Sequence, residues 1–229
     1  MKKLLSGFFV MAALANLASC TDNNNTTLTP NAQVKVVHAS PDAPNVDVTA
    51  NGNSVVNNLA FRGSTPYAQL APGQVNIQVR PTGSTTAVIN ATVPLLAGTS
   101  YSVFAINPVA SIGAAVTVDD LATPAQGRAH VRFFHFSPGA PAVTVGVVNG
   151  PDLFTNRSFN DQNSTTSLQA FTPVNAGTYN LAVRLASGGT VVLNVPNVNL
   201  EAGKIYTVYA RGIVGNATTP LGADIIVHN

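Results

Sequence analysis

Residues 34–48 have the sequence VKVVHASPDAPNVDV, and residues 131–145 have the sequence VRFFHFSPGAPAVTV. In each stretch an apolar run leads into His-x-Ser-Pro-x-Ala-Pro, and a run in which valines alternate with other residues follows. Alternation of this kind is typical of a β-strand with one buried face, and the prolines mark a turn between two strands. The sequence therefore predicts the same strand–turn–strand unit twice.

The duplication extends beyond this motif. The run LAGTSYSVFA at 96–105 corresponds to EAGKIYTVYA at 201–210. The second copy carries insertions, the largest in the polar stretch 160–167. A period near 100 residues is the length of a domain and not of a solenoid repeat. We therefore expect two tandem domains, repeat 1 over 34–120 and repeat 2 over 129–229, joined by a linker over 121–128.

Within each copy the strand patterns are of two kinds. Val75, Ile77 and Val79 alternate with polar residues, which predicts a strand with one packed face. Residues 101–106 and 205–210 are apolar or hydroxyl-bearing on both faces, which predicts central strands. No segment after the N-terminal region shows a helical apolar stripe with caps. About seven short strands in roughly 90 residues predict an all-β chain of two tandem immunoglobulin-like or transthyretin-like β-sandwich domains.

The N-terminal segment predicts export and lipid anchoring. Two lysines precede an apolar stretch at 4–17, which is too short to span a membrane. This stretch ends in Leu-Ala-Ser-Cys at Cys20, which resembles the bacterial lipobox. We expect residues 1–19 to be a signal peptide, Cys20 to be the lipidated residue, and 20–33 to be a flexible tether. The expected location is the cell envelope, at the outer membrane, with the periplasmic and surface orientations both open.

Composition excludes one class of partner. Charged residues make up 9% of the 229 residues, and the net charge of +2 includes two lysines of the signal segment. Their removal leaves nine basic against nine acidic residues, with no cluster of either sign. Because nucleic-acid binding needs a basic surface, we expect no nucleic-acid partner. The single cysteine, Cys20, also excludes a disulfide within one molecule.

The motif His-Ala-Ser-Pro-Asp-Ala-Pro at 38–44, followed by Val-Asp-Val, resembles the bacterial domain of unknown function 4397 family. The resemblance covers both repeats and nearly everything after residue 33. It implies an extracytoplasmic β-rich module, often in tandem and often lipid-anchored, and it implies no activity or catalytic residue. The second copy departs from the motif, because Gly139 stands in place of Asp42 and Thr144 in place of Asp47.

Two interpretations of the motif compete. A histidine, a serine and nearby carboxylates could form a metal site or a general base. The histidine, serine and prolines recur in repeat 2 without the carboxylates, which favours a role in stabilising the turn. Because the prolines of the turn supply no N–H, the imidazole and the hydroxyl could form the hydrogen bonds that its backbone lacks. We therefore predict no catalytic residue, no metal site shared by the repeats and no cofactor; a cation held by Asp42 and Asp47 in repeat 1 stays open. The predicted structural residues are His38, Ser40, Pro41, Pro44, His135, Ser137, Pro138 and Pro141.

Most aromatic residues recur in both copies, which indicates core packing. Phe154 and Phe159 flank the insertion of repeat 2, and we predict them as possible ligand contacts. The first functional hypothesis is a non-enzymatic, lipid-anchored module for adhesion, scaffolding or contact with an envelope protein. The alternative is a surface module that binds glycan.

Overall fold

The computed structural model describes residues 29–229, which form sixteen β-strands, eight in each repeat. The predicted lipidation site Cys20 and the signal segment 1–19 lie outside the described residues, as does most of the tether over 20–33. The strands of repeat 1 are β1 (Ala32–His38), β2 (Val46–Ala50), β3 (Asn53–Leu59), β4 (Ala68–Leu70), β5 (Gly73–Pro81), β6 (Ile89–Leu95), β7 (Ser100–Ile106) and β8 (Gly113–Asp119).

Repeat 2 follows the same order of elements and adds two short 3-10 helices: η2 (Asp161–Asn163) lies within the predicted insertion at 160–167, and η3 (Thr166–Gln169) spans its end. A third, η1 (Val109–Ser111), lies between β7 and β8. The strands of repeat 2 are β9 (Arg128–His135), β10 (Val143–Val147), β11 (Asp152–Arg157), β12 (Thr172–Asn175), β13 (Gly177–Leu185), β14 (Val191–Leu200), β15 (Ile205–Arg211) and β16 (Gly222–Val227).

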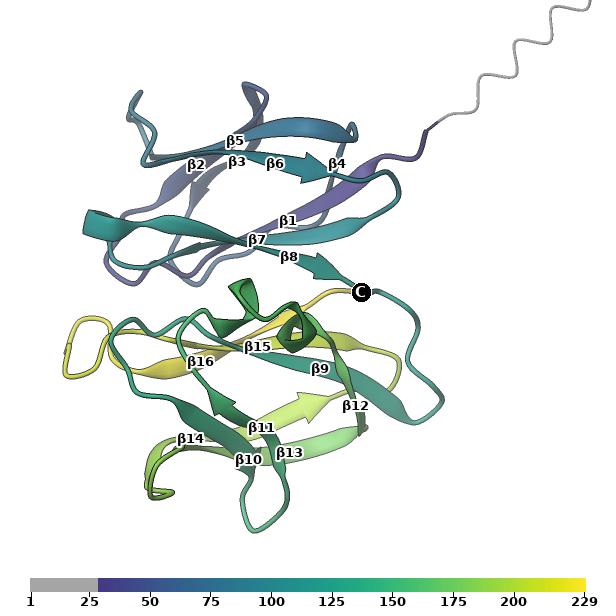
Figure 1. The fold of residues 1–229 in the computed structure, drawn as a ribbon, viewed down its shortest axis with the longest axis vertical. Helices are drawn as coiled ribbons and strands as arrows, with labels where there is room; N and C mark the ends of the chain where they lie inside the picture. Colours follow the sequence, from purple (N-terminus) through teal and green to yellow (C-terminus); the bar gives the residue numbers. More distant parts are fainter. Residues whose placement is uncertain (1–28) are drawn as a thin grey trace, which may run out of the picture.

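Each repeat is a sandwich of two four-stranded sheets (Figure 1). The sheets of repeat 1 have the orders β4-β1-β7-β8 and β3-β2-β5-β6, and those of repeat 2 have the orders β12-β9-β15-β16 and β11-β10-β13-β14. The pairs β1–β7 and β9–β15 are parallel. An immunoglobulin sandwich keeps its first two strands in one sheet. Here β1 and β2 lie in different sheets, which excludes the immunoglobulin arrangement. Of the two expected types of sandwich, the repeats therefore match the transthyretin-like one.

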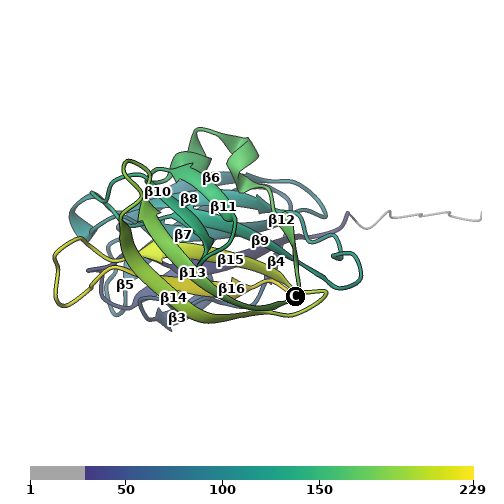
Figure 2. The same ribbon diagram turned by 90° about the horizontal axis from the view of Figure 1, so that it is seen from below.

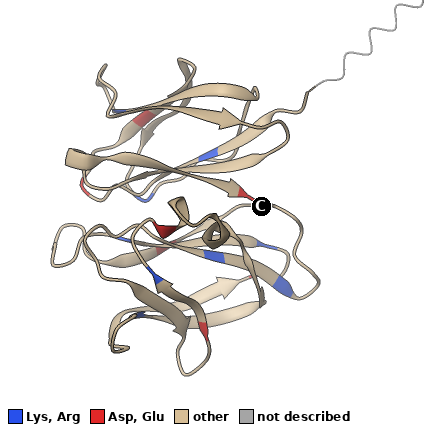
Figure 3. Ribbon diagram, viewed as in Figure 1, with Lys and Arg blue, Asp and Glu red and all other residues tan. Residues whose placement is uncertain are grey.

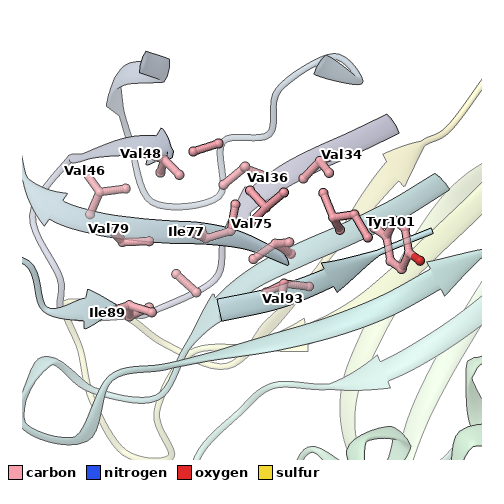
Figure 4. Close-up of a cluster of buried hydrophobic side chains, with 14 of the residues drawn as sticks. Val34, Val36, Val46, Val48, Val75, Ile77, Val79, Ile89, Val93 and Tyr101 are labelled. Atoms are coloured by element: carbon pink, nitrogen blue, oxygen red, sulfur yellow. The ribbon is translucent and has the colours of Figure 1, made fainter. Parts of the chain in front are cut away.

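Alternating side chains build the core of each sandwich. Val75, Ile77 and Val79 of β5 are buried, as predicted, and face Val34 and Val36 of β1 (Figure 4). The hairpin between β2 and β3 has a two-residue Asn-Gly loop in which both residues have positive φ, the geometry that matches the twist of the paired strands. Sequence periodicity thus places one face of each sheet inside.

A third apolar cluster joins the two repeats. It contains Val37 and Phe104 from repeat 1 and Phe134, Phe136 and Tyr209 from repeat 2, all without measurable exposure. The rings of Phe104 and Phe136 lie 4.9 Å apart between centroids. These residues point outward from the sheets that carry β7 and β15, so the two sheets pack face to face. Both β7 and β15 are central strands, as predicted from residues that are apolar or hydroxyl-bearing on both faces.

Candidate functional site

The two motif turns make the same contacts. His38 closes β1, and its Nε2 lies 3.0 Å from the carbonyl oxygen of Pro44. His135 closes β9, and its Nε2 lies 3.2 Å from the carbonyl oxygen of Pro141. Burial lowers the pKa of both histidines, because a charged imidazole is poorly solvated there. Each neutral ring therefore donates to a turn carbonyl.

The serine of each motif ties its turn to a second loop. Ser40 Oγ donates to the carbonyl oxygen of Asn107, and Ser137 Oγ donates to that of Gly212 at 2.7 Å. Neither hydroxyl is paired with the imidazole of its own motif, which a nucleophile and its base require. These contacts are those expected of turn stabilisation.

The two motif carboxylates of repeat 1 serve separate loops. Asp42 Oδ1 accepts from Val109 N at 2.8 Å, whereas Asp47 Oδ1 accepts from Asn58 N at 2.7 Å and from Thr82 Oγ1 at 3.0 Å. Hydrogen bonding from the Asn58 backbone lowers the pKa of Asp47. Within residues 29–229 no group of three or more His, Cys, Asp or Glu side chains is placed to hold a metal ion.

The prediction that Phe154 contacts a ligand is wrong, because its ring is in the core. Phe154 is 9% exposed and stacks on Phe133 with 6.0 Å between ring centroids. Phe159 is half-buried and packs edge-on against His135, as its repeat 1 counterpart Phe61 packs against His38. Flanking an insertion suggested exposure, but strand β11 directs Phe154 inward.

A buried inter-repeat polar cluster was not predicted from the sequence. It consists of Tyr67 and Asp119 from repeat 1 and Arg132, Thr207 and His228 from repeat 2. Arg132 Nη2 lies 2.5 Å from Asp119 Oδ1, and neither side chain is exposed to solvent. Asp119 is the last residue of β8, next to the predicted linker, and its carboxylate reaches across the interface to repeat 2.

Aromatic rings and the insertion complete the surroundings of Arg132. Its guanidinium lies 4.6 Å from the ring centroid of Phe134 and 4.3 Å from that of Phe171. Gln169 of η3 accepts from Arg132 Nη1 through its carbonyl oxygen, and its side chain accepts from Val118 N on the edge strand β8. The insertion of repeat 2 therefore covers one side of the buried ion pair.

The hydrogen bonds of the cluster assign the proton on His228. Arg132 Nε donates to Thr207 Oγ1 at 2.8 Å, and the Thr207 hydroxyl is 2.8 Å from His228 Nε2. The Tyr67 oxygen is 2.6 Å from both His228 Nδ1 and Asp119 Oδ2. If the neutral ring carries its proton on Nδ1, every member has a partner, since Thr207 donates to Nε2 and Tyr67 donates to Asp119.

Electrostatics favour the same state. Burial, the largest influence, lowers the pKa of His228 to about 4, although the charge of Asp119 acts in the opposite direction. Burial together with Asp119 raises the pKa of Tyr67, so its hydroxyl keeps its proton. The cluster is a closed network that holds one ion pair and neutral neighbours.

A signal for this cluster is present in the sequence. Lys35 and Arg132 occupy equivalent positions of β1 and β9, each within a short stretch that is otherwise apolar on both faces, 34–37 and 131–134. Lys35 Nζ also crosses the interface, where it donates to the carbonyl oxygen of Val227 at 3.3 Å. A basic residue repeated within such a strand indicates that the outward face is covered.

Both motif turns lie at one end of the molecule, here called the motif end. Val37 and Ala39 beside one turn share the apolar cluster with Phe134 and Phe136 beside the other. Figures 1 and 2 show the described chain beginning at the right, whereas the loop 212–221, drawn in yellow at the left, lies at the motif end. Charged residues are scattered singly over the described ribbon (Figure 3).

Comparison with known proteins gives one family. The family model described as "Domain of unknown function (DUF4397)" matches residues 32–146, which hold all of repeat 1 and the first motif strands of repeat 2. No curated protein matches the chain. In the described part of the chain, no helix is long and apolar enough to cross a membrane.

Proposed function

The chain belongs to the family of domain of unknown function 4397, and we propose that it is a non-enzymatic, lipid-anchored module of the cell envelope that presents its motif end to a partner protein. The observation that carries this proposal is the fusion of the two repeats into one body. A buried aromatic cluster and a buried ion pair join them, so the module is a stiff spacer and not two hinged domains.

The direction of the chain supports presentation of the motif end. The described residues begin at Thr29 and enter β1, which runs from the opposite end toward its motif turn at His38. If Cys20 is lipidated and 20–33 is a tether, the membrane lies at the end where the chain begins. The motif end then faces away from the membrane, toward other components of the cell envelope.

A passive role is supported by how the motif side chains are used. The imidazoles of His38 and His135 and the hydroxyls of Ser40 and Ser137 are bound to backbone carbonyls. These bonds hold two proline-bounded turns in fixed shapes, which suits a surface for contact. Of the two aromatic residues that motivated the glycan alternative, Phe154 is buried in the core and Phe159 is half-buried against His135, and we propose a protein partner.

The anchoring part of the proposal has a direct test. Cells grown with a labelled fatty acid are expected to label the wild-type chain and not a Cys20→Ala variant, which is expected to leave the membrane fraction. A labelled Cys20→Ala chain would contradict lipidation at this residue. Fractionation of the two forms also reports which membrane carries the chain.

The contact part is tested by photo-crosslinking in the same cells. A photoreactive residue at Val109, at the motif end, is compared with one at Val148, in the β10–β11 turn; both valines are 41% exposed. We expect a discrete crosslinked band from position 109 and none from position 148. Equal patterns from the two positions, or no band from 109, would refute presentation by the motif end.

A further inference from the structure

Within residues 29–229 the four sheets end in eight edge strands, and seven of these carry a feature that hinders pairing with another chain. β4 and β12 have only three and four residues, and β6 and β14 each contain a proline. β3 and β11 have an irregular register against their neighbours. In β8, the N–H of Val118 donates to the side chain of Gln169. Short length, proline, bulges and covering side chains are the usual means of preventing association between sheet edges.

Strand β16 is the eighth edge and has none of these features. Its six residues contain no proline and pair with β15 in an unbroken register. Its one charged side chain, Asp224, is paired with Arg62 and Arg211. The equivalent strand of repeat 1, β8, is covered by the insertion of repeat 2, whereas repeat 1 has no such insertion to cover β16. The edge of β16 is therefore open.

Every second residue of β16 directs its backbone groups away from the sheet. His228 N donates to the carbonyl oxygen of Ile205 on β15. Because the direction of these groups alternates along an antiparallel strand, Ala223, Ile225 and Val227 direct their N–H and C=O groups to the open side. These are the groups that an added strand would bind.

The exposed side chains of the open edge are apolar. Ile225 and Val227 are 41% and 43% exposed, and they lie on the same face of the strand. Ile225 also lines a groove of about 240 Å³ with Val195 and Val198 of β14, which runs along the same side of repeat 2 (Figure 2). An added strand with an apolar residue at every second position would remove these side chains from water.

A second copy of β16 has this pattern. Antiparallel pairing about a two-fold axis at Ile225 sets this residue opposite Ile225 of the second copy, and Ala223 opposite Val227. Asp224 then lies opposite Ile226, so no like charges face each other. A two-fold axis at Asp224 would instead place two carboxylates opposite each other, which is unfavourable. The register centred on Ile225 is therefore self-complementary.

We propose that β16 pairs antiparallel with β16 of a second copy and joins the two β12-β9-β15-β16 sheets into one. The carbonyl of Val227 accepts from Lys35 Nζ at 3.3 Å and, with two lone pairs, can accept a second hydrogen bond. Antiparallel pairing places the two chain starts at opposite ends of the dimer. Copies anchored in facing membranes meet in this orientation, and each keeps its motif end directed away from its own membrane. The pairing itself does not rest on the proposed function.

The test is sedimentation equilibrium of residues 21–229, which contain every described residue. We expect a monomer–dimer equilibrium at concentrations up to about 0.5 mM. Ile225→Lys sets two ammonium groups opposite each other and is expected to weaken dimerisation about tenfold or more. Val118→Lys, at a position that is 51% exposed on the covered edge β8, is expected to leave it unchanged. A chain that stays monomeric, or a dimer that both variants weaken equally, overturns the proposal.

A single introduced thiol tests the register. Cys20 is the one cysteine of the chain, so residues 21–229 contain no other thiol. Ile225→Cys is expected to be joined to its second copy by a short bismaleimide, because Cβ atoms directly opposite in paired strands lie about 5 Å apart. Val118→Cys is expected to stay monomeric under the same conditions. Equal crosslinking of the two variants, or none at position 225, overturns the assignment.

Discussion

Replacement of His228 should remove one distinct part of the acid sensitivity of this protein above pH 4. Burial lowers the pKa of His228 to about 4 in the folded protein, against about 6.5 in an unfolded chain. Between these two values the unfolded state binds a proton that the folded state does not bind, so the free energy of unfolding falls as the pH falls. Above pH 6.5 neither state binds it, and the effect vanishes.

The size of the effect follows from the two pKa values. From pH 7.5 to 4.5, one such histidine lowers the free energy of unfolding by about 2.5 kcal/mol. Buried His38 and His135 add losses of the same sign, because their pKa values are lowered as well. The wild-type protein should therefore be markedly less stable at pH 4.5 than at neutral pH.

His228→Gln isolates the contribution of this residue. Glutamine keeps one donor and one acceptor for Tyr67 and Thr207 but does not titrate. Urea unfolding followed by circular dichroism at pH 7.5, 6.5, 5.5 and 4.5 should show the stability gap between wild type and variant narrowing by about 2.5 kcal/mol on acidification. A gap that stays constant with pH would refute the assignment of a neutral, buried His228.

Five further variants, one of them a double substitution, test the interface and the turns by urea unfolding. Asp119→Asn leaves the Arg132 charge buried without its partner and should cost about 3–5 kcal/mol, whereas Asp119→Leu combined with Arg132→Met should recover most of this loss; no recovery would contradict a buried ion pair. Phe104→Ala should cost about 3–5 kcal/mol through a cavity between the repeats, and a loss below 1 kcal/mol would contradict its burial. Ser40→Ala and Ser137→Ala should each cost about 1–3 kcal/mol, because a loop carbonyl loses its donor; a neutral result would contradict the turn-stabilising role.

The architecture of each repeat could be predicted from the alternation of apolar and polar residues, because one face of a sheet is exposed to solvent and the other packs in the core. Val75, Ile77 and Val79 report this alternation directly, and the run of apolar and hydroxyl-bearing residues at 101–106 identified a central strand. The duplication also allowed residues of one copy to be interpreted against the other. Histidine and serine recurred without the carboxylates, and both make backbone contacts in each turn.

The arrangement of the repeats could not be predicted, because it depends on which outward faces meet. The same apolar run at 101–106 is compatible with a strand covered by its own domain or by a neighbouring one. Asp119 ends β8, directly before the predicted linker, and nothing in its position along the chain indicates that residues of repeat 2 bury it. Phe154 was misplaced because its counterpart in repeat 1 is Val56, which pairs with Val48 as Phe154 pairs with Val145, so no aromatic residue of repeat 1 indicated that its ring is buried.

The buried ion pair explains how two similar apolar faces can dock in one register. Face-to-face sheets with aliphatic and aromatic surfaces would lose little contact if one slid past the other by a single strand spacing of about 4.8 Å. Such a shift would separate Arg132 from Asp119 and leave both charges buried and unpaired, at a cost far above that of the lost apolar contacts. The ion pair therefore contributes less to the total stability than to the selection of one docked arrangement. The double variant Asp119→Leu, Arg132→Met should fold, but its two repeats should dock in more than one arrangement. Distances between spin labels across the two repeats would broaden in that variant and stay narrow in the wild type.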